Sequence, residues 1–247
     1  MTVASIILKN VYVNGVDTKA RANGVKKLLC GAGKFDPTSA EIPILCGVDF
    51  EAKHGDKVAI IGRNGCGKSS LLKVISGIYP IASGHRHVVG NVAPLIEMGL
   101  GFDPDLSGLK NIKLSFAYRG KLGLYSEDLE RQIIEFAELG EKINLPLKSY
   151  SSGMQARLAF SCTVFQNPDI LLLDEVLAVG DQGFVEKSRK LIEQRFRDAP
   201  ISIIVHHAID QVKSLCNRFI LMDGGRVISE GSCKDILQEY RTKILKI

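Results

Sequence analysis

The chain has 247 residues, of which 45% are hydrophobic and 24% charged, and its formal net charge is +5. This composition is ordinary for a folded domain and argues against intrinsic disorder. No apolar run approaches the roughly 18 residues that a membrane-spanning helix needs, and residues 1–8 lack the basic segment and long apolar stretch of a secretory signal. We therefore expect a protein that stays in the cytosol.

The net charge leaves several classes of partner possible, whereas the cysteine spacing gives no sign of a C-x-x-C motif or a metal site. A mildly basic surface suits a solvated protein that docks near anionic lipid head groups, and nucleic acid is a further possibility. The cysteines form no C-x-x-C pair and no cluster with histidine at metal-ligand spacing. We interpret them as reduced, mostly buried small residues: Cys30, Cys46, Cys66, Cys162, Cys216 and Cys233.

Short apolar runs alternate along the chain with helical patterns, which predicts a parallel sheet covered by helices. The loop-rich stretch 15–41 comes first, with one short helix expected in it. Residues 105–150 show apolar positions at helical spacing and no strand-like run, so a mostly helical insertion is expected there. Asp223-Gly224-Gly225 predicts a hairpin turn. The expected buried strands are 57–61, 169–173, 201–205 and 219–222, and helices are expected at 69–77 and 154–165.

A glycine-rich segment between the first predicted strand and helix matches the pattern G-x-x-x-x-G-K-S. Its glycines allow successive backbone N–H groups to point at phosphate oxygens, and the following helix directs its positive dipole end to the same place. Lys68 adds a charge for the outer phosphates and Ser69 a hydroxyl ligand for Mg²⁺. We interpret Cys66 as a space-filling residue, the alternative being a redox switch. The expected nucleotide-binding residues here are Gly62, Arg63, Asn64, Gly65, Cys66, Gly67, Lys68, Ser69 and Ser70.

Phosphoryl transfer to water also needs a carboxylate that orients the metal and a group that positions the water. The apolar run 170–173 ends in Asp174 and Glu175, and the carboxyl end of such a strand faces the phosphate loop in a doubly wound sheet. We expect Asp174 to hold Mg²⁺ and Glu175 to polarise the attacking water. His206 and His207 follow the strand 201–205, where one of them is expected to sense the terminal phosphate.

The segment 150–157, Tyr-Ser-Ser-Gly-Met-Gln-Ala-Arg, resembles the signature motif of ABC ATPases, usually L-S-G-G-Q. The order and spacing of the phosphate loop and the acidic pair fit that family from about residue 6 onward. The resemblance implies one ABC ATPase domain over 1–247, with a parallel core sheet, an antiparallel β subdomain and a helical subdomain at roughly 105–160. It implies that Ser151, Ser152 and Gly153 bind the γ-phosphate held by a second, head-to-tail copy, that Asp181 is the D-loop aspartate and His207 the switch histidine, and that Glu97 replaces the Q-loop glutamine near the metal.

Departures from the common motifs resemble one subfamily. Ser152 stands for the first signature glycine, Met154 for the signature glutamine and Val176-Leu177 for the usual Pro-Thr. These features resemble the ATPase subunits that export lipid-linked polysaccharides such as O-antigens, capsules and teichoic acids. The resemblance implies an ATP- and Mg²⁺-dependent motor, peripheral at the cytoplasmic face of the inner membrane, that drives a polytopic permease and binds no nucleic acid.

Some alternatives stay open from the sequence. Tyr12 is the first candidate for stacking on adenine and Phe35 the second. A soluble ABC ATPase acting on ribosomes or DNA is the alternative function, although a single cassette without a sustained heptad pattern disfavours it. An importer or multidrug ATPase is disfavoured by the segments Y-S-S-G-M and A-V-G-D, and a regulator without turnover by the presence of both Asp174 and Glu175.

Overall fold

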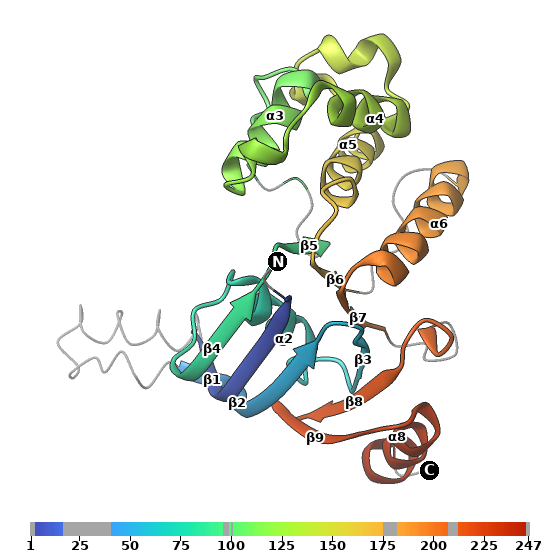
Figure 1. Cartoon of the computed structure of the whole chain (residues 1–247). Coiled ribbons are helices and arrows are strands. Elements are labelled where there is room, and N and C mark those ends of the chain that lie inside the picture. Colours follow the sequence, from blue (N-terminus) through green and yellow to red (C-terminus); the bar gives the residue numbers. More distant parts are fainter. Residues whose placement is uncertain are drawn as a thin grey trace, which may run out of the picture.

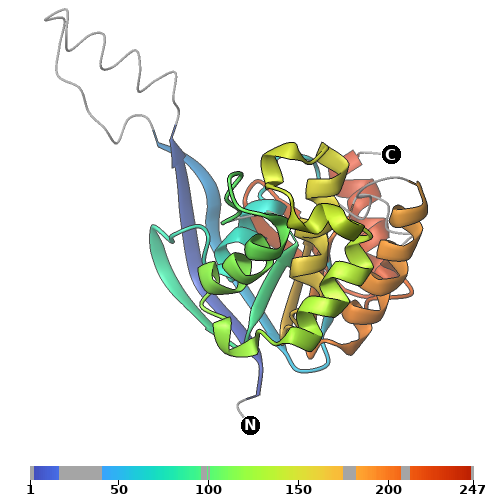
Figure 2. The same ribbon diagram turned by 90° about the horizontal axis from the view of Figure 1, so that it is seen from above.

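A computed structural model describes residues 3–16, 41–95, 99, 101–174, 182–206 and 212–245. Strands gather at one end of the molecule and most helices at the other (Figure 1). The view from above shows the antiparallel strands on one side and the helices α5, α6 and α8 on the opposite side of the central sheet (Figure 2).

The central sheet has six strands in the order β5-β6-β7-β3-β8-β9, all parallel except β9. Its middle strands are buried along most of their length, as expected for parallel strands covered on both faces. At the predicted turn, Gly224 and Gly225 have φ values of 50° and 74°, which suits a tight hairpin. The predicted strands are confirmed as β3 (Lys57–Ile61), β6 (Ile170–Asp174), β7 (Ile201–Val205) and β8 (Arg218–Asp223), with β5 (Val92–Leu95) and β9 (Arg226–Gly231) at the edges.

A second, antiparallel sheet has the order β2-β1-β4. It consists of β1 (Ser5–Val16), β2 (Glu41–Lys53) and β4 (Ser83–Val89). Helix α2 (Lys68–Ser76) packs between this sheet and the central one, because Leu71, Leu72 and Ile75 belong to the same buried cluster as Ile6 and Ile60. The helix that begins at the phosphate loop is therefore held from both sides.

Helical elements fill the chain between β5 and β6. They are α3 (Gly108–Tyr118), η2 (Leu122–Leu124), α4 (Glu127–Ala137), η3 (Gly140–Asn144), η4 (Leu147–Ser149) and α5 (Ser152–Val164). Serines cap α3, α4 and α5, since the side chains of Ser107, Ser126 and Ser151 each accept the amide hydrogen of the residue three positions on. Ile112, Phe116, Ile133 and Leu158 give this part a core of its own.

One predicted boundary is wrong. We expected the helix after the signature segment to begin at Met154, with Gly153 before it, but α5 begins at Ser152. The cause is the cap: Ser151 Oγ accepts from Met154 N at 3.3 Å, which places Gly153 inside the first turn.

The remaining helices cover the face of the central sheet that is opposite α2 and the antiparallel sheet. They are α6 (Gln182–Asp198) and α8 (Cys233–Glu239), and a π-helical turn (Tyr240–Leu245) continues α8. Phe184, Ile192 and Phe196 of α6 pack with Leu171 and Ile204 of the sheet. None of the helices in the described part of the chain could span a membrane.

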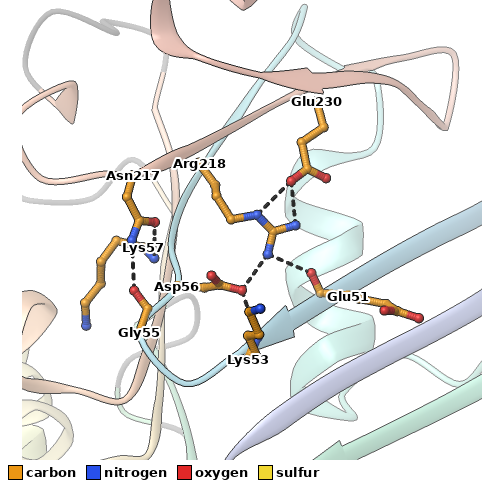
Figure 3. Close-up of polar contacts among 8 residues, drawn as sticks. All are labelled: Glu51, Lys53, Gly55, Asp56, Lys57, Asn217, Arg218 and Glu230. Carbon is orange, nitrogen blue, oxygen red and sulfur yellow. Dashed lines mark hydrogen bonds and ion pairs between the residues drawn. The ribbon is translucent and has the colours of Figure 1, made fainter.

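Arg218 joins the two sheets at the amino end of β3 (Figure 3). It donates to Glu51 O of β2 at 3.1 Å, to the Glu230 carboxylate of β9 at 2.7 Å and to the buried carboxylate of Asp56. Asp56 also accepts from Lys53 N at 2.8 Å. A cavity of about 460 Å³ lies beside this network. It is at the opposite end of β3 from the phosphate loop, which follows Ile61.

Candidate nucleotide-binding site

The segment 62–67 forms a loop whose shape depends on its glycines. Gly65 and Gly67 have φ values of 79° and 104°, a left-handed region that L side chains rarely adopt. A Cβ at Gly67 would lie 2.9 Å from Leu45 Cδ2, and one at Gly62 only 2.2 Å from Met222 O. The glycines of the predicted motif are therefore required by the fold of this loop.

Lys68 directs a buried charge into the loop. Its side chain is 7% exposed, and Nζ donates to Gly62 O and Arg63 O, each at 2.9 Å. Both partners are neutral carbonyls, and among the described residues no carboxylate forms an ion pair with Lys68. A buried ammonium without a counter-ion is a site for an anion, and the amino end of α2 adds its dipole.

Cys66 ties the loop to two other segments. Its amide donates to Arg63 O at 3.3 Å, and its carbonyl accepts from Gly225 N at 3.0 Å, while Gly225 O accepts from Cys46 N at 2.9 Å. Burial raises the pKa of the Cys66 thiol, although the charge of Lys68 acts in the opposite direction. A neutral, buried thiol favours the space-filling interpretation over the redox one.

The register of the central sheet places Asp174 level with the start of the loop. Asp174 on β6 pairs with Val205 on β7, and Val205 pairs with Ile60 on β3. Ser69 is exposed in the first turn of α2. Hydroxyl and carboxylate oxygens are the ligands that Mg²⁺ prefers, usually together with substrate phosphates. No group of three or more His, Cys, Asp or Glu side chains in the described residues is placed to hold a metal.

The signature residues lie at the helical end of the molecule. Ser151 and Ser152 are exposed, and a Cβ built at Gly153 would meet nothing within 4 Å. In Figure 1, α5 begins among the helices, whereas α2 lies between the two sheets. The structure therefore does not bring residues 151–153 to the phosphate loop of the same chain. Met154, in place of the usual glutamine, packs into the helical core.

Tyr12 lies on β1 and is partly buried. The Tyr12 hydroxyl lies beside Gly47 of β2, since a Cβ built at Gly47 would come within 2.9 Å of Tyr12 Oη. The phosphate loop lies beside the same strand, because a Cβ built at Gly67 would meet Leu45 and Ile44 O. Tyr12 and the loop are therefore next to different positions of β2. Its stacking on adenine stays a prediction.

Several predicted residues lie outside the described part of the chain. They are Phe35, Glu97, Glu175, Asp181 and His207. His206, directly before the last of these, is 7% exposed at the end of β7. The predicted roles of all five stay predictions.

Arg86 is a residue that sequence reasoning missed. It lies on β4 and donates from Nε to Val74 O and from Nη2 to Ile75 O, each at 2.7 Å. These carbonyls lie in the last turn of α2, where Val74 O also accepts from Gly77 N, so the guanidinium adds donors at this end of the helix and opposes the negative end of its dipole. Arg86 shows no local signal, because its partners lie on another element.

With this geometry described, the comparisons with known proteins identify the family. The ABC transporter family matches residues 45–178, more than half of the chain. The chain belongs to this family. Its predicted fold is confirmed by two solved structures. One is an ATP-binding subunit of an ABC transporter (20% identity, TM-score 0.68, 95% of this chain and 92% of that one). The other is a dimeric ATP-binding cassette bound to ADP and phosphate (22% identity, TM-score 0.66, 92% and 98%).

The most informative ABC relatives are named as export proteins. The O-antigen export system ATP-binding protein of Yersinia enterocolitica is 35% identical over 92% of this chain and 97% of its own length. The teichoic acids export ATP-binding protein of Listeria innocua is 40% identical over 84% of this chain and 63% of its own length. An O-antigen export ATP-binding protein of Myxococcus xanthus is 40% identical over 82% and 46%. The chain thus spans less than two thirds of the last two relatives.

Proposed function

We propose that this chain is the ATP-hydrolysing subunit of an ABC exporter that moves a lipid-linked polysaccharide of the O-antigen, capsule or teichoic acid type across the cytoplasmic membrane. The observation that carries the proposal is the likeness to the O-antigen export protein of Yersinia enterocolitica over nearly the whole of both chains. The subfamily features around Ser151 and Asp174 point the same way.

The nucleotide site is built on the loop 62–70. Backbone amides of this loop and the Lys68 ammonium bind the phosphates, and Tyr12 stacks on adenine. Ser69, Asp174 and Glu97 hold Mg²⁺, which when bound neutralises charge on the phosphate oxygens. Lys68 has no ion pair with a carboxylate among the described residues, and this, with the level of Asp174 in the sheet, supports the assignment.

Hydrolysis is assigned to residues at the carboxyl ends of β6 and β7. Glu175 polarises the attacking water, His207 contacts the terminal phosphate, and Asp181 lies at the subunit boundary. In the sequence, Glu175 directly follows Asp174, the last residue of β6, and His207 follows His206, which comes after β7. β7 pairs with β3, and β6 pairs with β7.

The second half of each site comes from a second copy of the chain, arranged head to tail. Ser151 and Ser152 are exposed, a Cβ at Gly153 would meet nothing within 4 Å, and all three residues are remote from the phosphate loop of their own chain, which supports a role on a partner's nucleotide. A two-fold arrangement makes two equivalent sites at once. A γ-phosphate bound by both halves gives the differential contact that closure requires.

The membrane step belongs to a separate polytopic permease, and this chain attaches to it at the cytoplasmic face. The names of the export relatives support such a partner. The polysaccharide reaches the complex through the permease, and no nucleic acid takes part.

Purification of the native complex tests the transport proposal. A small polytopic membrane protein should co-purify with the tagged chain, and deletion of the gene should cause a lipid-linked glycan to accumulate, measured by mass spectrometry of lipid extracts. A tagged chain that is consistently recovered alone, with an unchanged lipid profile, would contradict export.

Glu175→Gln tests the hydrolysis proposal. Loss of the general base should slow turnover by roughly 10²- to 10⁴-fold while ATP binding persists. Steady-state ATPase assays and fluorescent-nucleotide titration measure the two effects separately. Turnover close to that of the unchanged protein would remove Glu175 from this role.

A further inference from the structure

Glu138 occupies an unusual backbone position at the end of α4. Its φ and ψ are 54° and 41°, the left-handed conformation that non-glycine residues adopt uncommonly. Such a conformation persists where the surrounding structure maintains it, and it is frequent at functional positions. Here it turns the side chain toward two other helices.

The Glu138 carboxylate bridges α5 and α6. Oε1 accepts from Lys187 Nζ of α6 at 2.5 Å, and Oε2 lies 3.9 Å from Arg157 Nη1 of α5. The Lys187 ammonium also donates to Phe136 O at 3.3 Å. One side chain therefore contacts both helices from the end of a third.

Aromatic rings fix where the two cations lie. Lys187 Nζ is 4.5 Å from the ring centre of Phe136, and the Arg157 guanidinium is 5.6 Å from that of Phe184. Phe136 and Phe184 contact each other at 5.4 Å, and both contact Phe160. Each cation thus lies between a ring face and the same carboxylate, an arrangement with little rotational freedom.

The positions of the two cations along the chain indicate what this contact could do. Arg157 is one helical turn beyond Gly153, and Lys187 is six residues beyond Asp181. We propose that Glu138 is a positioning residue that orients the amino end of α5, which carries residues 151–153, relative to α6, the helix that follows Glu175 and Asp181 in the sequence. This inference rests on the proposed function, since it supplies the reaction in which the orientation matters.

Stability alone gives a weak reason for such a contact. The Glu138 side chain is 51% exposed, and an ion pair in that setting adds little to the free energy of unfolding. A carboxylate shared between two helices instead restricts their relative angle. Movement of α6 during turnover would then be transmitted to residues 151–153, which face the partner's nucleotide in the proposed dimer.

Three variants of the full chain test this inference. Glu138→Gln removes the charge from both contacts, and Lys187→Gln removes the α6 contact together with the contacts of the ammonium to Phe136. The matched control is Glu186→Gln, which breaks the exposed 3.0 Å pair between Glu186 and Lys190 within α6 and leaves α5 untouched. Each variant is assayed for kcat and KM of ATP hydrolysis, for binding of a fluorescent ATP analogue, and for amide hydrogen exchange without nucleotide.

For Glu138→Gln and Lys187→Gln we expect kcat to fall about three- to thirtyfold, the range found for residues along coupling networks. Analogue affinity and KM should stay within about twofold, and exchange should accelerate in 151–157 and in the first turns of α6. A variant that combines Glu138→Gln with Lys187→Gln should be no worse than Glu138→Gln alone, because both substitutions remove the same network. The control should match the unchanged protein in every assay.

Other outcomes would overturn the inference. They are an unchanged kcat with unchanged exchange, an equal loss in Glu186→Gln, or a loss of affinity that merely parallels lower thermal stability. Failure of the proposed hydrolysis looks different: the unchanged protein would then turn over no ATP. The exchange measurement still tests the contact in that case, since it needs neither ATP nor turnover.

Discussion

Lys68 shows how a residue predicted from a pattern acquires a physical role. Its ammonium is buried and bonded to two carbonyls of its own loop. A carbonyl stabilises such a charge less than an anion does. The side chain is therefore held where a phosphate oxygen would be a better partner.

Replacing Lys68 by alanine should weaken nucleotide binding about ten- to hundredfold, the range for a lost hydrogen bond to a charged group. Titration with a fluorescent ATP analogue measures the change. The control is Lys73→Ala on the same helix, whose ammonium lies 5.1 Å from the Tyr79 ring centre and outside the loop. Equal affinity for the unchanged chain and Lys68→Ala would contradict the proposed cradle.

Lys121 carries a partly buried ammonium at the junction of the helical part with the central sheet. It donates to Val92 O at 3.1 Å and to Gln166 Oε1 at 3.2 Å. Burial, with the nearby charge of Arg119, lowers the pKa of Lys121 to about 8, although Asp169 opposes the shift.

This lowered pKa gives a pH dependence of defined sign. Between about pH 8 and the ordinary lysine value of 10.5, the unfolded chain binds more protons at this site than the folded one. The free energy of unfolding of the unchanged protein should therefore rise with pH in that window relative to Lys121→Met, and the difference should be constant below pH 8. Urea unfolding from pH 7 to 10 measures this difference in the free energy of unfolding.

The control is Lys148→Met, at an exposed pair with Asp105, which should follow the unchanged protein throughout. Parallel curves for Lys121→Met and the unchanged protein would contradict the lowered pKa of Lys121.

At the scale of single elements, two glycines differ in whether the fold of the chain requires them. Gly67 is fixed by its backbone and by Leu45, whereas Gly153 has free space around its Cα within its own chain. A glycine that the fold does not require, on an exposed helix start, is best explained by something that approaches from outside.

Gly153→Ala should therefore keep or slightly raise the melting temperature, since alanine favours a helix over glycine. It should nevertheless lower ATP-driven association and turnover, because the added methyl group would meet the partner's nucleotide. Calorimetry, sedimentation with ATP and ATPase assays measure these effects. Gly123→Ala, at another site with nothing within 4 Å, serves as the control. Full turnover in Gly153→Ala would argue against a signature contact.

Sequence patterns predicted some elements and missed others for physical reasons. The strands β3, β7 and β8 are continuous apolar runs and were predicted well, whereas β1 was not. Its buried residues Ile6 and Leu8 are followed by Val11 and Val13 after a register shift, with Asn10 at φ 50°. This bulge breaks the alternation of period two that marks a strand.

The residues of the candidate site were likewise predicted only in part. The phosphate loop is one local segment, so its residues are evident from the sequence alone. Arg86 and the Gly225 link act across elements distant in the sequence, and no local pattern indicates them. The antiparallel sheet was expected only through the family resemblance.

At the scale of the whole molecule, Arg218 connects strands of both sheets. Its partners belong to β2, β9 and the turn before β3, and Asp56 is buried beneath it. Removing the guanidinium would leave the Asp56 carboxylate with one donor among the described residues, the amide Lys53 N.

Arg218→Ala should lower the free energy of unfolding by about 1.5–3 kcal/mol, as expected for a lost hydrogen bond to a charged group. Urea denaturation measures it. Arg131→Ala, which breaks an exposed pair with Asp128, should change stability by less than about 0.5 kcal/mol. A similar small effect in both variants would show that the connection between the sheets does not depend on Arg218.

The order of the central strands also determines when the protein can acquire its site during synthesis. The strand that leads into the phosphate loop, β3, lies between β7 and β8, and its partners are residues 202–205 and 218–221. A nascent chain that has emerged from the ribosome only as far as residue 200 has neither neighbour of that strand. Contacts so distant in sequence form late and slowly. The strand before the phosphate loop therefore reaches its place in the sheet only after β8 has been translated, so ATP binding can stabilise the fold only at that late stage.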